Sequence, residues 1–188
     1  MTDPAPRHRV PTDVRTPFST PWLTVREALT GTGAGPGDRW YYLDHPGCAL
    51  VLPVTEQGEV LLVRSWRIAV RQWCVEAPAG RCEPGETPEQ TARRELREET
   101  GAHGGTFRSL GSVWPSSGTS NELVHLFVAH GVRPGPAEPD PGEVLHLHPL
   151  PVRKAVAMAA GGELRDAPTA LALLLAEHRG ALDHGGGR

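Results

Sequence analysis

The chain has 188 residues, of which 22% are charged and 38% hydrophobic, and its formal net charge is −3. This length suits one domain with a full core and a small appended element. Because the chain is weakly acidic and carries no basic stripe, we expect it to bind neither nucleic acid nor a membrane surface. Its partner is therefore expected to be a small molecule.

The three cysteines, Cys48, Cys74 and Cys82, are odd in number and form no C-x-x-C pair. This pattern argues against a disulfide framework or a structural zinc site, and it suits a reducing cytoplasm. Residues 1–17 are polar and proline-rich without the apolar core of a signal peptide, and no later stretch reaches transmembrane length. We predict a cytoplasmic protein with flexible tails at residues 1–17 and 183–188.

The N-terminal part predicts a small antiparallel β subdomain over residues 18–46. Residues 22–26 alternate between apolar and polar like a strand, and residues 39–43 form a second such run. The glycine-rich stretch 31–38 separates them, so the pair is predicted to form a hairpin. The main domain is then expected to cover residues 47–182.

The main domain alternates between strand and helix patterns. Apolar runs bounded by turn residues predict strands at 48–54, 59–66, 72–76, 106–114, 123–129 and 143–148. Helical patterns at 152–160 and 167–179 follow, the second with Leu171, Leu174 and Leu175 expected to face the core. Strands flanked by helices predict an α/β sandwich with a mixed sheet.

A further helix is defined at both of its ends. Thr87 supplies an N-cap hydroxyl, Pro88 suits the first helical position, and Gln90 can bond back to the cap. Gly101 is the left-handed residue expected just beyond the C-terminal end. The helix is therefore predicted to begin at about residue 88 and to have three to four turns.

Three acidic residues of this helix, Glu95, Glu98 and Glu99, stand at i, i+3 and i+4 and share one face. Like charges at this spacing cost about 0.2–0.5 kcal/mol per pair and oppose the helix dipole. A solvated, salt-bridged surface is the ordinary explanation of such a face. However, only Ala92 and Leu96 are clearly apolar, so the polar face is unusually broad. A hard divalent cation is the expected partner.

The spacing around this helix resembles the Nudix hydrolase box. Glu86 follows Gly80 by six residues, Arg94 follows Glu86 by eight, and the run Glu-Leu-Arg-Glu-Glu-Thr-Gly comes next. Every fixed position of the box is met, and Ala102 is the one soft departure because a bulkier aliphatic is usual there. The resemblance implies a Nudix-type α/β/α sandwich that hydrolyses a nucleoside diphosphate linked to another moiety.

A larger part of the chain, from about residue 22 to residue 179, is similar to the ADP-ribose pyrophosphatase branch of that family. The segments that carry this similarity are 22–26, 63–67, 73–80 and 118–122. In that branch the N-terminal strands are exchanged across a homodimer. The resemblance therefore implies a homodimer with composite sites that binds a nucleoside diphosphate-linked small molecule.

The resemblance also implies a Mg²⁺ site, with Mn²⁺ as a possible substitute. The ligands that it implies are Glu95, Glu99, the backbone carbonyl of Ala79, and Glu98 as a further ligand or water-positioning group. Glu86 and Arg94 match the pair that braces the box loop against the helix. For the general base, Glu143 is the best match on a loop before the last strand, and Glu138 and Asp140 are alternatives.

Other positions match substrate contacts of the branch. Trp22 and Trp40 match aromatic residues that sandwich adenine, although each could instead pack in the hairpin core. Arg67 matches a residue that contacts the diphosphate. Glu76 could read an exocyclic amine or simply end its strand.

Three positions depart from the branch, and they leave the substrate open. Tyr41 stands where some members have a glutamate for the base, His45 where some have an arginine, and Ser117 where proline is usual. ADP-ribose or a related nucleotide sugar is the leading substrate. The alternatives are the same chemistry on a pathway-specific nucleotide or damaged nucleoside triphosphate, and a nucleotide-sugar-binding regulator without catalysis.

Overall fold

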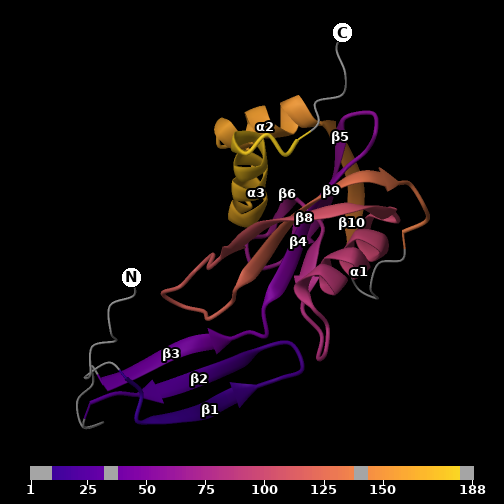
Figure 1. Ribbon diagram of the computed structural model, residues 1–188. Coiled ribbons are helices and arrows are strands. Elements are labelled where there is room, and N and C mark those ends of the chain that lie inside the picture. Colours follow the sequence, from indigo (N-terminus) through magenta and orange to yellow (C-terminus); the bar gives the residue numbers. More distant parts are fainter. Residues whose placement is uncertain (1–9, 32–37, 138–143, 183–188) are drawn as a thin grey trace. The chain divides into compact units, whose positions relative to one another are not determined.

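The structure is a computed structural model that describes residues 10–31, 38–137 and 144–182. The chain divides into two compact units (Figure 1). The first unit comprises Met1–Pro46 and Ser116–Leu123, and the second comprises Gly47–Pro115 and Val124–Arg188. The segment 116–123 falls within the predicted main domain, whereas the structure groups it with the N-terminal strands.

The first unit is a three-stranded antiparallel sheet of β1 (Asp13–Ser19), β2 (Thr24–Leu29) and β3 (Arg39–Asp44), in that order. The pairing of β2 with β3 confirms the predicted hairpin. The predicted N-terminal tail is too long, because residues 13–17 belong to β1 and pair with β2. Residues 1–9 and 183–188 lie outside the described residues.

Hydrogen bonds explain why the segment 116–123 belongs to this unit. Ser120 forms an isolated parallel bridge with Leu43 of β3. The Asn121 side chain donates to Asp44 Oδ1 at 2.8 Å and accepts from the backbone N–H of His45 at 2.8 Å. These partners are about 77 positions apart in the sequence, so no local pattern could indicate their pairing.

The second unit contains a mixed sheet of seven strands: β4 (Cys48–Val54), β5 (Glu59–Arg67), β6 (Gln72–Glu76), β7 (Ala79–Arg81), β8 (His103–Val113), β9 (Val124–Arg133) and β10 (Leu145–Pro151). The order is β10-β5-β4-β9-β8, with β6 paired to β5 and β7 paired to β4. β4 runs parallel to β9, and the other pairings are antiparallel. The predicted mixed sheet is confirmed.

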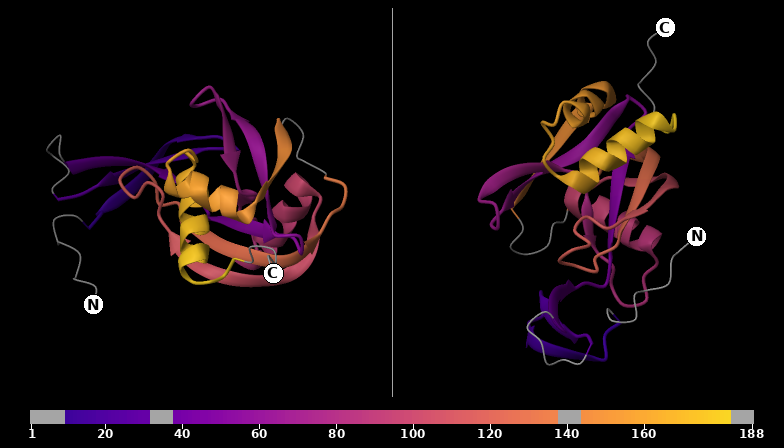
Figure 2. Two further views of the ribbon diagram at one scale, coloured as in Figure 1. Left: turned by 90° about the horizontal axis from the view of Figure 1, so that it is seen from above. Right: turned by 90° about the vertical axis from the view of Figure 1, so that its left-hand side faces the viewer.

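Within the described part of the chain, three helices cover this sheet: α1 (Pro88–Thr100), α2 (Val152–Ala160) and α3 (Ala167–His178). Alternate residues of β4 point to opposite faces, as the period of a strand requires. Leu50 and Leu52 share a core with α2 and α3, whereas Ala49 and Val51 share another with α1. The unit is therefore the predicted α/β/α sandwich, and Figures 1 and 2 show α2 and α3 together on one side of the sheet.

Helix α1 begins and ends as the sequence predicts. The Gln90 backbone N–H donates to the Thr87 hydroxyl, and the Gln90 side chain accepts from the Thr87 N–H at 2.7 Å. Gly101 caps the other end with φ 71°, a value that favours glycine. Both ends are thus fixed by local hydrogen bonds.

Helix α3 follows the prediction only in part: Leu175 packs against the core as expected, but Leu171 and Leu174 do not face it. Leu171 and Leu174 are 37% and 38% exposed, while Ala172, Leu173 and Ala176 are buried. The sequence is apolar around nearly the whole helix, so its period does not define one face. The buried Thr169 hydroxyl, which accepts from the Ala77 N–H at 2.9 Å, sets the orientation instead. No helix among the described residues is long and apolar enough to cross a membrane.

The α3 orientation predicts unequal effects of two similar substitutions. Leu173→Ala removes a fully buried side chain and should lower the free energy of unfolding by about 2–5 kcal/mol. Leu171→Ala should change it by about 0.5 kcal/mol or less, because that side chain is partly solvated. Urea unfolding of both variants measures the difference, and equal losses would contradict the observed orientation.

Candidate active site

The acidic face of α1 is largely buried against β7. Glu95 and Glu99 are 9% and 6% exposed, and Glu98 is half-buried. A methyl group built on Gly80 would lie 1.9 Å from Glu95 Oε1. Glycine is therefore required for the Glu95 carboxylate to lie over the backbone of β7, immediately beside Ala79.

Arg94 connects the acidic residues to one another. Its Nη1 donates to Glu95 Oε1 at 2.6 Å and to Glu98 Oε2 at 2.9 Å. Its Nε donates to Glu86 Oε1 at 3.0 Å, and its Nη2 donates to the carbonyl oxygen of Arg81 at 2.9 Å. One guanidinium thus joins the helix face to both β7 and the loop before the helix.

Glu86 is held in its charged form by these contacts. Hydrogen bonds from Arg94 lower the pKa of Glu86 to about 2, against an opposing effect of burial. The Thr91 hydroxyl, at 2.8 Å from Oε2, and the Glu83 N–H, at 3.2 Å, lower this pKa further. Glu86 is therefore ionised at neutral pH and fixes the loop to the helix.

This group of residues fits a hard divalent cation. Carboxylate and backbone carbonyl oxygens are the ligands that Mg²⁺ prefers, and Gly80 leaves the space in which the Glu95 carboxylate lies. Within the described ranges, no group of three or more His, Cys, Asp or Glu side chains is already arranged around a metal position. A cation that binds here has to compete with Arg94 for Glu95 and Glu98.

Arg67 and Glu76 form a second charged pair in this unit. Arg67 Nε donates to both carboxylate oxygens of Glu76, at 3.0 and 2.9 Å. Glu76 is buried, whereas the Arg67 side chain is 54% exposed. The hydrogen bonds to Glu76, with a smaller effect of Glu99, raise the pKa of Arg67. Glu76 thus orients Arg67, an arrangement that neither alternative from the sequence anticipated.

Trp22 and Trp40 lie in the first unit, and neither packs in a hairpin core. Trp22 is 84% exposed in the turn between β1 and β2, and Trp40 is 48% exposed on β3. Trp22 precedes the first residue of β2, whereas Trp40 pairs with Ala28 near its last residue. At about 3.3 Å per residue, these positions are too far apart for one base to stack between them within this chain.

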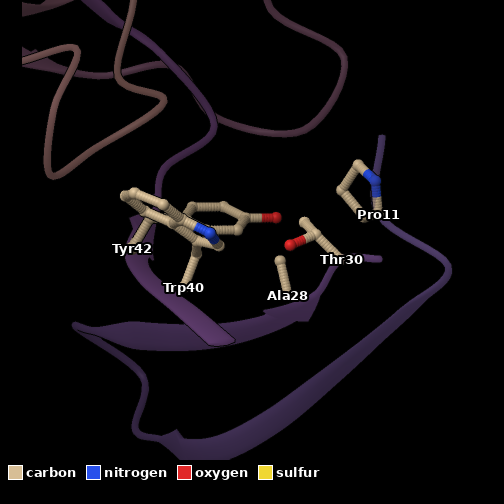
Figure 3. A pocket seen from close by; sticks show the side chains of 5 residues that line it. All are labelled: Pro11, Ala28, Thr30, Trp40 and Tyr42. Atoms are coloured by element: carbon tan, nitrogen blue, oxygen red, sulfur yellow. The ribbon is translucent and has the colours of Figure 1, made fainter. Parts of the chain in front are cut away.

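Trp40 lines an apolar hollow of about 330 Å³ on the sheet of the first unit. The residues that line it are Pro11, Ala28, Thr30, Trp40 and Tyr42. Figure 3 shows the rings of Trp40 and Tyr42 beside each other over this hollow. Tyr42 is not among the predicted site residues, which include its neighbour Tyr41. Alternation along β3 places Tyr42, not Tyr41, on the Trp40 face.

Tyr41 faces the opposite side of that sheet. Its hydroxyl donates to Glu27 Oε1 at 2.8 Å, and Arg39 Nη1 donates to the same oxygen at 2.9 Å. These bonds lower the pKa of the buried Glu27 and raise the pKa of Tyr41. Some members of the branch have a glutamate at position 41 itself, and here a glutamate lies beside that position. It comes from β2, so only the pairing of β2 with β3 reveals it.

Of the remaining predicted site residues, one has a side-chain contact in the structure and the others lie outside the described residues. The His45 ring lies with Nδ1 at 3.9 Å from Glu122 Oε1, within the first unit. Glu143, with the alternatives Glu138 and Asp140, lies outside the described residues. The general base therefore remains a prediction.

Comparison with known proteins gives matches over the same region. The family model for the NUDIX domain matches residues 44–172. The ADP-ribose pyrophosphatase of Bacillus subtilis (strain 168) is 35% identical over 140 residues, which cover 73% of this chain and 76% of that protein. The GDP-mannose pyrophosphatase of Citrobacter koseri is 34% identical over 141 residues, covering 68% and 71%.

A solved structure, described as the crystal structure of ADP compounds hydrolase, superposes with a TM-score of 0.72. It covers 92% of this chain and 96% of its own, at 19% sequence identity. At this identity the superposition bears on the fold alone. It agrees with the mixed sheet and the small antiparallel sheet described above.

The low pKa of Glu86 predicts a pH-dependent difference in stability. Because the pKa is lowered from 4.5 to about 2, Glu86 stabilises the fold fully above about pH 4.5 and loses this contribution as the pH falls toward 2. Glu86→Gln should therefore be less stable than wild type at pH 7, with the gap narrowing below pH 4.5. Urea unfolding from pH 7 to pH 3 measures the gap, and a constant gap would contradict the assignment.

Proposed function

The chain belongs to the NUDIX domain family, and from this premise we propose that it is a Mg²⁺-dependent pyrophosphohydrolase that cleaves the diphosphate of ADP-ribose or a related nucleotide sugar. The observation that carries the proposal is the buried Glu95 carboxylate over Gly80, on the face that also bears Glu98 and Glu99. The ADP-ribose and GDP-mannose pyrophosphatases among its relatives support this substrate class.

In this proposal the acidic face holds the cation. The residues that would hold it are Glu95, Glu98, Glu99 and the backbone carbonyl of Ala79, with Mn²⁺ as a possible substitute for Mg²⁺. Held there, Mg²⁺ would supply Lewis-acid polarisation of the diphosphate and would offset the negative charge that develops on the bridging oxygen. Arg94 and Glu86 keep the carboxylates directed toward β7 through the hydrogen bonds described above.

Arg67 is the proposed contact for the diphosphate. Glu76 occupies its Nε and Nη2, whereas Nη1 makes no hydrogen bond within the described part of the chain. The side chain is more than half exposed and lies within electrostatic reach of Glu99. An oriented guanidinium with a free donor beside the acidic face is suited to bind a phosphate oxygen.

The reaction needs a water molecule and a group that accepts its proton. We assign the proton acceptor to an acid of the segment 138–143, with Glu143 as the first candidate from the family resemblance. Attack of the water on one phosphorus breaks the diphosphate. With ADP-ribose the products are AMP and ribose 5-phosphate.

We also propose that the protein works as a homodimer. All seven residues of β1 are exposed, and large apolar surfaces are also exposed by Phe18 of β1, by Trp22 in the following turn, and by Trp40 and Tyr41 on opposite faces of β3. Such surface suits contact with a second copy. Stacking of a base between Trp22 of one copy and Trp40 of another would resolve their separation within one chain. A single-chain mass in sedimentation at assay concentrations would contradict the dimer.

The substrate assignment predicts the order of kcat/KM values among a set of candidate substrates. With Mg²⁺ present, ADP-ribose and nucleotide sugars should be hydrolysed to monophosphates at higher kcat/KM than dinucleotides or nucleoside triphosphates. GDP-mannose belongs in the panel because Tyr41 stands where some members of the branch have a glutamate for the base, and its hydroxyl donates to Glu27. Chromatography of the products measures the ranking. Preference for triphosphates would favour the damaged-nucleotide alternative, and binding of ADP-ribose without turnover would favour a regulator.

The acidic face makes a prediction for single substitutions. Glu98→Gln and Glu99→Gln should each lower kcat by at least about 100-fold, because each removes a charge that faces the cation and the developing anion. Glu89→Gln is the matched control, since Glu89 lies on the same helix but pairs with Arg93 at the surface. Steady-state kinetics over a Mg²⁺ titration, with circular dichroism for folding, measure the effect. Rates like wild type in both variants would overturn the proposed cation site.

A further inference from the structure

Strands β6 and β7 are joined by a turn of two buried residues, Ala77 and Pro78. β6 is antiparallel to β5, and β7 is antiparallel to β4. Because β4 and β5 are themselves antiparallel, the chain has to reverse its direction between the end of β6 at Glu76 and the start of β7 at Ala79. The turn therefore lies where the chain leaves β5 and begins to pair with β4.

A hydroxyl from α3 completes the hydrogen bonding of this turn. An N–H that is buried without an acceptor is costly, so a buried turn needs partners for its N–H groups. Pro78 has no N–H, and its carbonyl oxygen accepts from the Val51 N–H at 3.0 Å. The Ala77 N–H donates to the Thr169 hydroxyl at 2.9 Å. A side chain of α3 thus takes the place of a strand partner at this point.

Thr169 is itself held in place at the start of α3. Its side chain is fully buried, and its backbone N–H donates to the carboxylate of the N-cap residue Asp166 at 2.9 Å. The neighbouring Arg165 Nη1 donates to Gln72 Oε1 at 3.3 Å. The start of α3 therefore bonds to the first residue of β6 and to the residue that directly follows β6.

The turn separates two groups that the proposed function uses. Glu76, directly before the turn, orients Arg67 through bonds from its Nε to both carboxylate oxygens. Ala79, directly after the turn, carries the carbonyl group that is the proposed backbone ligand of the cation. A displacement of the turn would therefore move the diphosphate contact and the cation ligand relative to each other.

We propose that Thr169 is a positioning residue for the hydrolysis, because its hydroxyl fixes the turn between the Arg67–Glu76 pair and the Ala79 carbonyl. This inference rests on the proposed function. The Thr169 side chain is fully buried and acts only through the Ala77 N–H. Groups that orient the ligands of a metal in this indirect way typically contribute about 10–100-fold in metal affinity or activity.

Thr169→Val tests the proposal, with Thr169→Ser as the matched control. Valine has nearly the shape of threonine but no acceptor, so the Ala77 N–H loses its partner while it stays buried. Serine keeps the hydroxyl. Leu110→Ala is the control for lost stability, because it removes a buried side chain on β8, which lies at the edge of the sheet two strands from β4.

In Thr169→Val, kcat should fall and the Mn²⁺ dissociation constant should rise, each by at least about tenfold. Thr169→Ser and Leu110→Ala should keep the wild-type values of both. Steady-state kinetics and electron paramagnetic resonance of Mn²⁺, below the unfolding temperature of each variant, measure these quantities. A wild-type value of either quantity in folded Thr169→Val, or equal changes in Leu110→Ala, would overturn the proposal.

A second variant carries the test if Thr169→Val does not fold. Thr169→Ala also removes the acceptor, and alanine favours a helix more than valine does, so the same direction of change is expected in both quantities. Unchanged values would overturn the proposal. If wild type hydrolyses none of the candidate substrates, the proposed function fails and this inference fails with it. An active wild type whose Thr169 variants behave like it removes the inference alone.

Discussion

The Arg94 guanidinium is the charge on which the acidic face of α1 depends. Glu95, Glu98 and Glu99 repel one another on one side of a helix whose C-terminal dipole also opposes them. Arg94 binds two of these carboxylates and, through Glu86, the loop that precedes the helix. The ion pairs therefore allow these carboxylates to lie together without unfolding the end of the helix. A divalent cation requires such a group of negative charges.

The lack of a side chain at Gly80 and at Gly101 matters as much as the charges. The Glu95 carboxylate lies where a Cβ on Gly80 would be, and the end of α1 meets the Gly135 backbone where a Cβ on Gly101 would be. Helix α1 is thus held closely at both ends of its acidic face, by β7 near one and by residues 135–137 near the other. The carboxylates therefore have little freedom to move together, which favours a fixed cation position over a diffuse acidic surface.

The parts of the structure that local signals determine could be predicted from the sequence. The capping box and the C-terminal glycine of α1 act within a few residues, and the helix follows the prediction at both ends. By contrast, the orientation of α3 depends on a bond between Thr169 and Ala77, and β1 exists only through its pairing with β2. The proximity of Glu27 to Tyr41 is likewise a property of strand register. Contacts of this kind leave no periodic signal along the chain.

In the proposed function, the residues for hydrolysis and the residues for base selection belong to different units of the chain. The acidic helix, Arg67 and Glu76 all belong to the second unit, whose core fixes them through strands and helices. Trp40, Tyr42 and the Glu27–Tyr41 pair belong to a small sheet with few buried side chains. Substitutions on such a sheet disturb little packing, so under the proposed function base preference could change there while the residues for hydrolysis stay the same. Tyr41 and His45 differ from the residues found in some members of the branch, whereas every fixed position of the Nudix box is met. This pattern is consistent with that division.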